Sequence, residues 1–338
     1  MRTAIIGVGS MGRRHLYAMR DLELDLVAIC DGRTESLALA SAEHNIHAEQ
    51  QFTNASQMLE QTRPECVIVA TTAPSHCDYT CAAAAAGARF ILCEKPMAIS
   101  LDQCDRMIQT CDERGASLAI NHPMRFMKQY TEAKRLVQSE SFGALCSVTV
   151  IAGNLGLAMN GTHLFEMFRF ITDEAPAEVT GWLMSEKVPN PRGAEFDDRG
   201  GNVRVTTASG KRLYLELGAD QGHGMLVIFY GRYGRLVVDP FKGLMTVSAR
   251  EEQYRQSPTA QYNLPGVETE KRFAAASAVE SSRRALEALL RQEDFPTAQQ
   301  GRQAMEVLIA AYVSDENGHV PVALAGANLP QARQFPWA

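Results

Sequence analysis

Nowhere in the 338 residues does an uninterrupted apolar run reach the roughly 18–20 residues that a membrane-spanning helix needs. The strongest candidate, from Cys81 to Cys93, is broken by Gly87 and Arg89. The N-terminal apolar stretch Ala4–Ile6 is too short for a secretory signal peptide, and the basic residues follow it instead of preceding it. These absences predict a cytoplasmic protein that has no membrane partner.

An excess of positive charge is also absent, because 33 Lys+Arg stand against 39 Asp+Glu and the formal net charge is −6. Proteins that bind nucleic acid through its phosphates need a clustered basic surface. The composition therefore argues against a nucleic-acid partner. It leaves room for a local basic pocket that binds a small anionic substrate.

The eight cysteines include no Cys-x-x-Cys pair. Cys77 and Cys81 lie four residues apart, but no second Cys/His pair at zinc-finger spacing accompanies them. We predict no metal site, and we interpret the cysteines as small buried side chains that stay reduced.

The first 120 residues alternate short apolar runs with helical patterns, and the chain length suggests about two domains. Strands are predicted at Thr3–Gly7, Leu24–Cys30, Cys66–Thr71, Arg89–Cys93 and Ser117–Ile120. Helices are predicted at Ser10–Met19 and Thr34–His44, after capping boxes at Asn54 and Ser100, and from a first turn that contains Pro74. This alternation predicts a parallel sheet that is covered on both faces.

After about residue 122, extended runs separated by short turns predict a mostly antiparallel sheet. The expected strands are Leu145–Ile151, Glu178–Met184, Asn202–Thr207, Arg212–Gly218, Met225–Tyr230 and Arg235–Val238. The expected helices are Lys128–Ser139, His163–Ile171, Lys271–Arg291 and Thr297–Ser314. The fold class is thus α/β: a doubly wound Rossmann domain at 1–122, then an α+β domain with a large, mostly antiparallel open sheet at 123–338. A long loop, Val188–Gly201, is typical of functional or mobile segments.

A GxGxxG motif, Gly7-Val-Gly9-Ser-Met-Gly12, follows the first predicted strand and opens a helix. Asp31 ends the second predicted strand, at the spacing of about 20 residues that completes the dinucleotide-binding fingerprint. Gly7 permits the tight turn, Gly9 lets the backbone approach the pyrophosphate, and Gly12 allows close helix–strand packing. The N–H groups at the helix start, from Ser10 and Met11, then face the anion.

Asp31 also bears on the choice of cofactor. Its carboxylate would accept hydrogen bonds from the adenosine ribose hydroxyls and repel a 2′-phosphate, which favours NAD over NADP. Arg33 has the opposite tendency, because its guanidinium could reach a 2′-phosphate.

Three further motifs follow predicted parallel strands: Ala70-Thr-Thr-Ala-Pro-Ser-His76, Cys93-Glu-Lys-Pro96 and Asn121-His-Pro-Met-Arg125-Phe. The carboxyl ends of such strands are where an open α/β sheet binds its ligand. Together these motifs resemble the glucose-fructose oxidoreductase / inositol dehydrogenase (Gfo/Idh/MocA) family. The resemblance covers essentially the whole chain, recurs around His163, and ends with a segment from Tyr312 that resembles the family's last helix and final strand.

The resemblance implies hydride transfer between NAD(P) and a carbinol or keto carbon of a sugar, polyol or nucleotide-sugar. It implies that Lys95 exchanges the hydroxyl proton, that Pro96 shapes the loop, and that His163 is a second acid/base or a ligand of the substrate hydroxyl. A lysine near a cationic nicotinamide has its pKa lowered toward neutrality, which suits that role. It further implies cofactor contacts from Thr71, Thr72, His76, Glu94, Lys95 and Asn121, and substrate contacts from Lys95, His122, Arg125, Asn160 and His163.

The chain departs from the family pattern just before His163. Family members commonly carry Asp four residues before that histidine, where this chain has Met159 followed by Asn160. Neither side chain is a carboxylate base. We therefore expect Asn160 to orient a substrate hydroxyl and Lys95 to do the proton work, with or without His163. Glu166, three residues past the histidine, replaces the usual Asp and is compatible with a structural role.

Several alternatives stay open at this point. His76 fits a capping or packing role as well as a place beside nicotinamide, and His223 fits a turn as well as a substrate loop. Arg192 and Arg199 in the long loop fit solvated positions better than an anion site. The resemblance implies a homodimer or homotetramer formed through the second sheet. Instead of a dehydrogenase, the chain could be a dinucleotide-binding regulatory protein without turnover, or an enzyme that recycles tightly bound NAD with no net redox.

Overall fold

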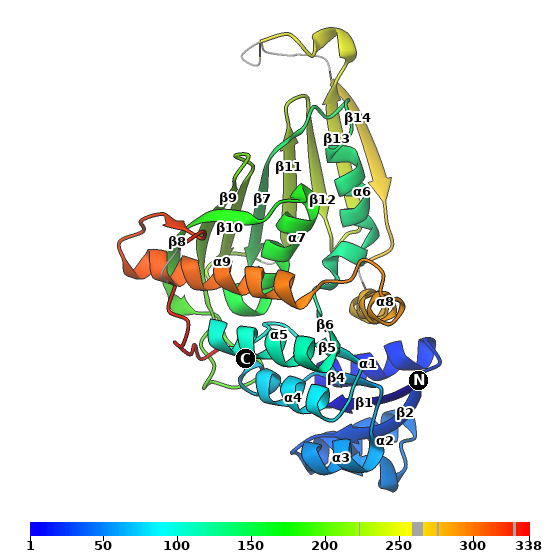
Figure 1. Cartoon of the computed structure of the whole chain (residues 1–338). Helices are drawn as coiled ribbons and strands as arrows, with labels where there is room; N and C mark the ends of the chain where they lie inside the picture. The colour runs from blue at the N-terminus through cyan, green and yellow to red at the C-terminus, as the bar shows by residue number, and fades with distance from the viewer. Residues whose placement is uncertain (223, 259–265, 276, 327–328) are drawn as a thin grey trace.

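The structure is a computed structural model that describes residues 1–222, 224–258, 266–275, 277–326 and 329–338. In this part of the chain, two sheets lie one beyond the other along the molecule, with helices packed on both (Figure 1). His223 lies outside the described residues, so its predicted place in a substrate loop stays a prediction.

The first sheet is parallel and, within the described ranges, has six strands in the order β3-β2-β1-β4-β5-β6. The strands are β1 Arg2–Ile6, β2 Asp25–Cys30, β3 Gln51–Phe52, β4 Cys66–Val69, β5 Phe90–Cys93 and β6 Ser117–Ile120. The connecting helices are α1 Ser10–Asp21, α2 Thr34–His44, the short η1 Ala48–Gln50, α3 Ala55–Thr62, α4 Ala73–Ala85 and α5 Leu101–Arg114. The predicted parallel sheet is confirmed, and the strand order reverses between β1 and β4, where such sheets bind ligands.

Two of the predicted helix starts show how side chains set these elements. Asn54 Oδ1 accepts the Gln57 backbone N–H at 3.0 Å, and Ser100 Oγ accepts that of Gln103 at 3.3 Å. Each cap satisfies a backbone donor that the helix leaves unpaired. Capping boxes were predicted at both positions, but the reciprocal bond from the residue three positions on is seen at neither. At Ser100, the Gln103 side chain accepts a hydrogen bond from Ile99 N–H instead.

The second sheet has nine strands in the described part of the chain, in the order β14-β13-β12-β11-β7-β10-β9-β8-β15. Its pairs are antiparallel apart from β7 with β10, which confirms the predicted architecture. The strands are β7 Leu145–Gly153, β8 Pro176–Lys187, β9 Arg199–Thr207, β10 Arg212–Gly218, β11 Met225–Gly231, β12 Gly234–Asp239, β13 Leu244–Arg250, β14 Gly266–Arg272 and β15 Val322–Ala323.

The helix predicted at Lys271–Arg291 begins later than expected. Lys271 and Arg272 belong to β14, where they pair with β13, and the helix α8 spans Ala278–Arg291. Ser277 caps it by accepting the Glu280 N–H at 3.2 Å. The prediction failed here because β14 is a charged edge strand, whose polar sequence carries little strand signal.

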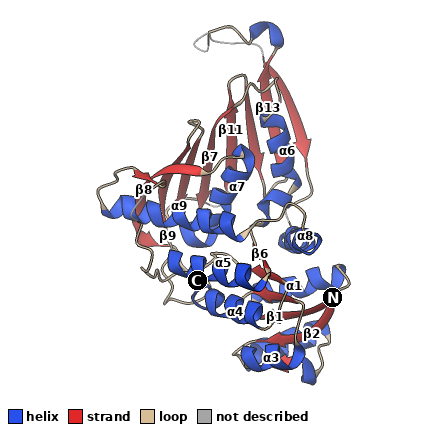
Figure 2. Ribbon diagram, viewed as in Figure 1, coloured by secondary structure: helices blue, strands red, loops and turns tan. Residues whose placement is uncertain are grey.

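The second sheet is covered by helices on one face (Figures 1 and 2). These are α6 Lys128–Val137, α7 Thr162–Thr172 and α9 Ala298–Glu316; the short turns η2 Pro123–Phe126, η3 Leu157–Gly161 and η4 Glu252–Tyr254 complete the elements. Phe165 and Phe168 of α7 share one buried cluster with Val148 and Val150 of β7. Within the described ranges, the helices are too short or too polar to span a membrane.

Helix α8 packs against the first sheet although it lies near the end of the chain. Leu286 and Leu289 join a buried cluster with Ile5, Leu16 and Met19. The predicted boundary at residue 122 thus separates the strands of the two sheets but not their packing, and as a domain boundary it stays a prediction.

The last ten residues return to the first domain, as Figure 1 shows by the position of the C-terminus beside α5. Phe335 N–H donates to Ile99 O at 2.9 Å, and Phe335 stacks on Trp337 with ring centroids 4.5 Å apart. The tail also holds the loop between β8 and β9, because Asp197 N–H donates to Pro336 O at 2.7 Å. This loop thereby becomes a wall of the cleft described next.

Candidate active site

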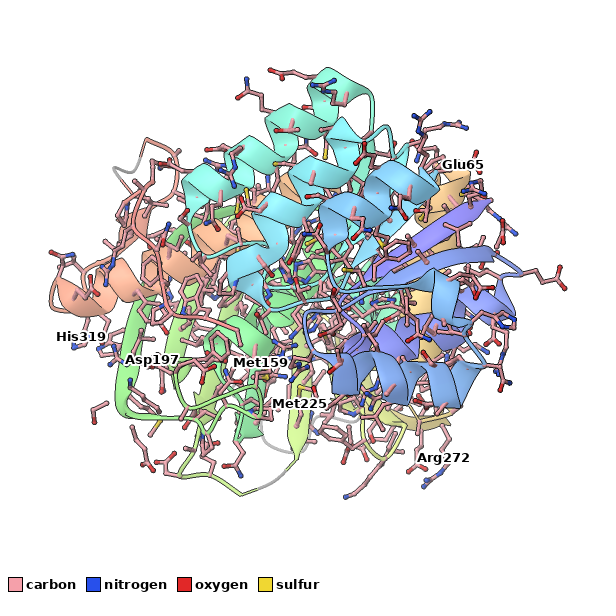
Figure 3. All side chains as sticks on the ribbon, turned by 90° about the horizontal axis from the view of Figure 1, so that it is seen from below. Glu65, Met159, Asp197, Met225, Arg272 and His319 are labelled. Carbon is pink, nitrogen blue, oxygen red and sulfur yellow. The ribbon has the colours of Figure 1, made fainter. Side chains whose placement is uncertain are left out.

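A cleft of about 1020 Å³ opens at the carboxyl ends of β1, β4, β5 and β6. It also receives residues from the second part of the chain, including Met159 and Met225, which lie near the centre of the molecule in Figure 3. The sequence-predicted residues that line it are Gly7, Gly9, Ser10, Met11, Asp31, Arg33, Thr71, Thr72, Glu94, Lys95, Asn121, Asn160 and His163. Gly12, His76, His122 and Arg125 are buried and do not line it.

The glycine turn has the shape that a pyrophosphate needs. Gly7 has φ of +91°, and a Cβ on Gly12 would lie 2.0 Å from the Gly7 carbonyl oxygen, so both positions require glycine. A Cβ on Gly9 would have the Arg33 side chain as its neighbour, at 3.7 Å, which is ordinary van der Waals contact, so the space beside Gly9 is largely open. No side chain among the described residues caps the N-terminus of α1. Its backbone donors are therefore available to an anion in the cleft.

Asp31 ties this turn to the end of β2. Its Oδ2 accepts the Val8 N–H and its Oδ1 accepts the Arg33 N–H, each at 2.9 Å. A carboxylate has about four acceptor positions, so Asp31 retains capacity for ribose hydroxyls. The Arg33 guanidinium lies 3.7 Å from the same carboxylate and is largely exposed. Both groups that bear on the choice between NAD and NADP thus stand at one end of the cleft.

Glu94 is buried in a network that sequence analysis did not find. Its Oε1 accepts hydrogen bonds from His15 Nε2 at 2.8 Å and from Asn121 Nδ2 at 2.7 Å. Burial raises the pKa of Glu94, but the bond from His15 and the charge of Lys95 outweigh it and hold that pKa well below its usual range. Asn121 also donates to Ser282 of α8, at 3.1 Å. Glu94 is therefore a fixed, ionised acceptor at the cleft floor.

Lys95 follows Glu94 and is almost completely buried, with 8% of its surface exposed. Its Nζ donates to the main-chain carbonyl of Met159 at 2.6 Å. Burial lowers the pKa of Lys95 to about 8, against the opposing effect of Glu94. The sequence argument attributed a lowered pKa to the cofactor's charge, whereas the protein alone produces one.

His163 lies in the first turn of α7 and lines the cleft. Burial, together with the charge of Lys95, lowers the pKa of His163 well below its usual value, and burial lowers the pKa of His122 to about 4. The two rings meet edge to face at a centroid distance of 5.5 Å. Both imidazoles are thus neutral at pH 7. Nδ1 of His163 is buried and has no hydrogen-bond partner within the described residues.

Met159, which replaces the family's usual Asp, contributes through its backbone. Its carbonyl accepts from Lys95, while its N–H donates to Asp198 Oδ2 at 2.9 Å. Asn160 lines the cleft beside it. The departure from the family pattern therefore leaves a polar group next to Lys95, although the side chain at position 159 is apolar.

His76 supports the loop that carries Lys95 from behind. Its Nδ1 lies 2.9 Å from the Pro96 carbonyl oxygen and its Nε2 lies 3.2 Å from that of Thr71. Burial lowers the pKa of this imidazole. The packing role that the sequence left open matches these contacts, and the ring does not face the cleft.

Arg125 forms a buried ion pair with Glu166, and it donates to Gln300 at 2.7 Å and to Asp294 at 3.1 Å. These contacts join η2 to α7 and to the start of α9. All these partners are protein side chains, and the predicted substrate contact from Arg125 stays a prediction. Glu166 fits its predicted structural interpretation.

Asp198 is the most informative residue that sequence analysis overlooked. It lies in the long loop where Arg192 and Arg199 were considered, and only 2% of its surface is exposed. Arg192 lines the cleft and donates to Ala338 O at 3.1 Å, while Arg199 pairs with Asp315 at 3.3 Å away from the cleft.

No group of three or more His, Cys, Asp or Glu side chains in the described ranges is placed to hold a metal ion.

Comparison with known proteins agrees with this geometry. Residues 1–122 match the family described as "Oxidoreductase family, NAD-binding Rossmann fold". The chain is 30% identical over 185 residues to D-apiose dehydrogenase of Paraburkholderia graminis, an alignment that covers 50% of this chain and only 48% of that protein. It is 24% identical over 282 residues to myo-inositol 2-dehydrogenase of Thermotoga maritima, covering 76% of this chain and 80% of that protein.

The fold is shared with an oxidoreductase from Agrobacterium radiobacter that was solved in complex with NAD+, L-tartaric acid and magnesium. The TM-score is 0.78 at 18% identity, and the match covers 96% of this chain and 99% of that one. At this identity the likeness establishes the fold, including both sheets, and not the substrate.

Proposed function

We propose, from the premise that this chain belongs through its first 122 residues to the Gfo/Idh/MocA family of NAD-binding oxidoreductases, that it is an NAD-dependent dehydrogenase or reductase of CH–OH groups. The substrate class is a sugar, polyol or nucleotide-sugar. The observation that carries the proposal is a single one: a buried lysine with a pKa of about 8 faces the same cleft as the glycine turn.

The residues present fit the cofactor. The open space at Gly9 and the N-terminus of α1 would hold the pyrophosphate, and Asp31 would hold the adenosine ribose. Glu94, Thr71, Thr72 and Asn121 line the cleft farther along. When bound, NAD supplies the acceptor or donor of hydride.

Lys95 handles the proton in this proposal. In oxidation, its neutral amine takes the substrate hydroxyl proton and becomes an ammonium while the carbon–oxygen double bond forms; in reduction, the ammonium returns that proton. His163, which is neutral, holds the hydroxyl oxygen or its proton through a ring nitrogen. Asn160 orients a neighbouring hydroxyl, because an amide donates and accepts hydrogen bonds without titrating.

The test is nicotinamide absorbance with purified protein, NAD or NADP, and a panel of inositols, aldoses, sugar acids and nucleotide-linked sugars. We expect net NADH formation with at least one compound. Confirmed NADH binding without turnover anywhere on a broad panel would contradict the proposal. Single-turnover reduction of retained cofactor without NADH release would instead indicate internal recycling.

The two alternative functions have less support. Two of the similar proteins, D-apiose dehydrogenase and myo-inositol 2-dehydrogenase, are dehydrogenases by name, and the cleft contains a lysine with a lowered pKa, which a binding module does not need. A regulatory protein without turnover, or an enzyme with no net redox, is therefore not favoured.

Asp31 is expected to set the cofactor preference. Asp31→Ser removes the charge that would repel a 2′-phosphate and leaves Arg33 free to approach it. We expect the ratio of the NADPH to the NADH dissociation constant to fall by at least about tenfold, roughly 1.4 kcal/mol. Fluorescence titration with NADH and NADPH measures it, and Asp21→Ser, on the exposed end of α1, is the control. An unchanged ratio would show that another group sets the preference.

We further propose that the protein works in the cytoplasm as a homodimer or homotetramer formed through the second sheet. The uncovered face of that sheet carries exposed Ile151, Trp182, Tyr214, Leu226 and Tyr230. Ile151 pairs with Leu226 on one side and with Glu216 on the other, so neighbouring strands present these side chains on the same face. Contiguous exposed apolar surface of this kind favours association.

A further inference from the structure

We propose that Asp198 is a positioning residue for Lys95, because it holds the peptide segment whose carbonyl binds the lysine amine. Asp198 lies in the loop between β8 and β9, whereas the segment it holds, at Ala158 and Met159, precedes α7. The inference rests on the proposed function only for its effect on turnover. Its effect on Lys95 itself is independent of any substrate.

The contact is specific in geometry. Asp198 Oδ1 accepts the Ala158 N–H at 2.8 Å and Oδ2 accepts the Met159 N–H at 2.9 Å. Both donors belong to the first turn of η3, so a carboxylate distant in sequence caps this turn with both oxygens. On the other side of the Met159 residue, its carbonyl accepts from Lys95 Nζ at 2.6 Å. One residue therefore connects the carboxylate to the amine.

Gly156 provides a second, independent sign that the chain is built around this carboxylate. A Cβ on Gly156 would lie 2.1 Å from Asp198 Oδ2. The backbone of Gly156 is extended, with φ −93° and ψ 155°, which other residues adopt readily. Glycine is thus required at this position by the contact with Asp198 and not by the backbone conformation.

The charge of Asp198 also acts on Lys95. The charged or titratable groups near the amine are Glu94 beside it, Arg192 and Asp198 in the β8–β9 loop, His122 before η2, and His163 on α7. Asp198 and Glu94 raise the pKa of Lys95, while burial and Arg192 lower it. Burial raises the pKa of Asp198 to about 6, against the effect of its two backbone bonds, so the carboxylate is ionised at pH 7.

This arrangement explains how the chain accommodates Met159. Relatives are expected to carry a carboxylate at position 159. In this chain the main-chain carbonyl of Met159 lies next to the Lys95 amine, and the Asp198 carboxylate binds the N–H of the same residue. Asp198 does not touch the cleft, because it is absent from the lining, so it acts through the peptide and through its charge.

The experiment measures the pKa of Lys95 directly in the full-length protein, without cofactor or substrate. A short pulse of acetic anhydride at a series of pH values, followed by mass spectrometry of the Lys95 peptide, gives the midpoint for its deprotonation. Asp198→Asn removes the charge and places an amide N–H against one of the two backbone donors. We expect the midpoint to fall by about half a unit or more, and kcat on the identified substrate to fall about tenfold or more at an almost unchanged dissociation constant for NADH.

Asp197→Asn is the matched control, because Asp197 is adjacent, pairs with Lys187 at 2.7 Å, and is not among the groups that shift the pKa of Lys95. The charge of Asp197 raises the pKa of Asp198, so its removal leaves Asp198 ionised at pH 7. It should leave both the midpoint and kcat unchanged. An Asp198→Asn protein that folds and keeps the wild-type midpoint would overturn the proposal, as would an equal shift in the control.

If Asp198→Asn does not fold, Gly156→Ala serves the same purpose. The added methyl group displaces the Asp198 carboxylate from its contacts, while Asp198 keeps its negative charge. It should change the labelling rate of Lys95 at a fixed pH, and an unchanged rate would overturn the proposal. A shifted midpoint in a protein without dehydrogenase activity would support the role of Asp198 and contradict only the proposed function.

Discussion

Replacement of Lys95 by alanine is expected to lower kcat by about 10²–10⁴-fold, the range that a positioned general acid or base contributes. The expectation follows from the position of its amine, which faces the cleft from a nearly buried site. In the described part of the chain, its hydrogen-bond acceptor is the main-chain carbonyl of Met159. Neither His163 nor Asn160 can replace it, because the pKa of His163 lies far below neutrality and an amide does not titrate in this range. The dissociation constant for NADH should change by no more than a few-fold.

The pH dependence of kcat/KM tests the same role of Lys95. In the oxidative direction the neutral amine is the active form, so kcat/KM should rise with pH and level off above the Lys95 pKa of about 8. Lys95→Arg should be as inactive as the alanine variant, since a guanidinium keeps its proton throughout this range. Lys128→Ala, on the exposed first residue of α6, is the control and should keep the wild-type profile. A Lys95→Ala protein with near wild-type kcat would exclude Lys95 as the acid/base.

Replacement of Glu166 by alanine is expected to cost about 3 kcal/mol in the free energy of unfolding. Glu166 and Arg125 are both buried, and among the described residues the substitution leaves Arg125 with Asp294 and Gln300 as side-chain partners. It also removes the contact of Glu166 with Arg169 at 3.2 Å. Removing one member of a buried ion pair leaves an uncompensated charge in a medium that solvates it poorly, which usually costs about 3–5 kcal/mol. The two remaining partners place the expectation at the lower end.

Denaturant unfolding monitored by circular dichroism measures this difference. The control is Glu178→Ala, because Glu178 pairs with Arg204 at 3.6 Å with both side chains more than a third exposed. An exposed pair of this kind contributes at most about 1 kcal/mol. If the two variants lost the same small amount, the buried pair would not be a determinant of stability.

Much of the nucleotide-binding half was predictable because its signals are local. The GxGxxG turn requires glycine for steric reasons that act within a few residues: a Cβ on Gly12 would collide with the Gly7 carbonyl. Near-continuous apolar runs such as Cys66–Val69 and Phe90–Cys93 indicate strands that are buried on both faces. The N-caps at Asn54 and Ser100 likewise depend on residues three positions away.

Strands with weak local signals were missed. Gln51–Phe52 is too short for a periodic pattern, and Gly266–Arg272 is a charged edge strand that pairs on one side. Nothing in the sequence of α8 showed which sheet it would cover, because its apolar spacing is the same for either partner.

The amino-acid sequence by itself determined the nucleotide-binding turn, the alternation of strands and helices, and the presence of Lys95 and His163 at strand or helix ends. Tertiary structure alone decided what surrounds them. His15 bonds to Glu94, and Asp198 bonds to the N–H of Met159. The partners in each pair are so far apart in the sequence that the spacing of residues along the chain could not predict these contacts. The physical reason is that periodicity reveals which face of an element is buried but not which partner buries it. The environment that lowers the pKa of Lys95 comes into being only when those distant segments meet.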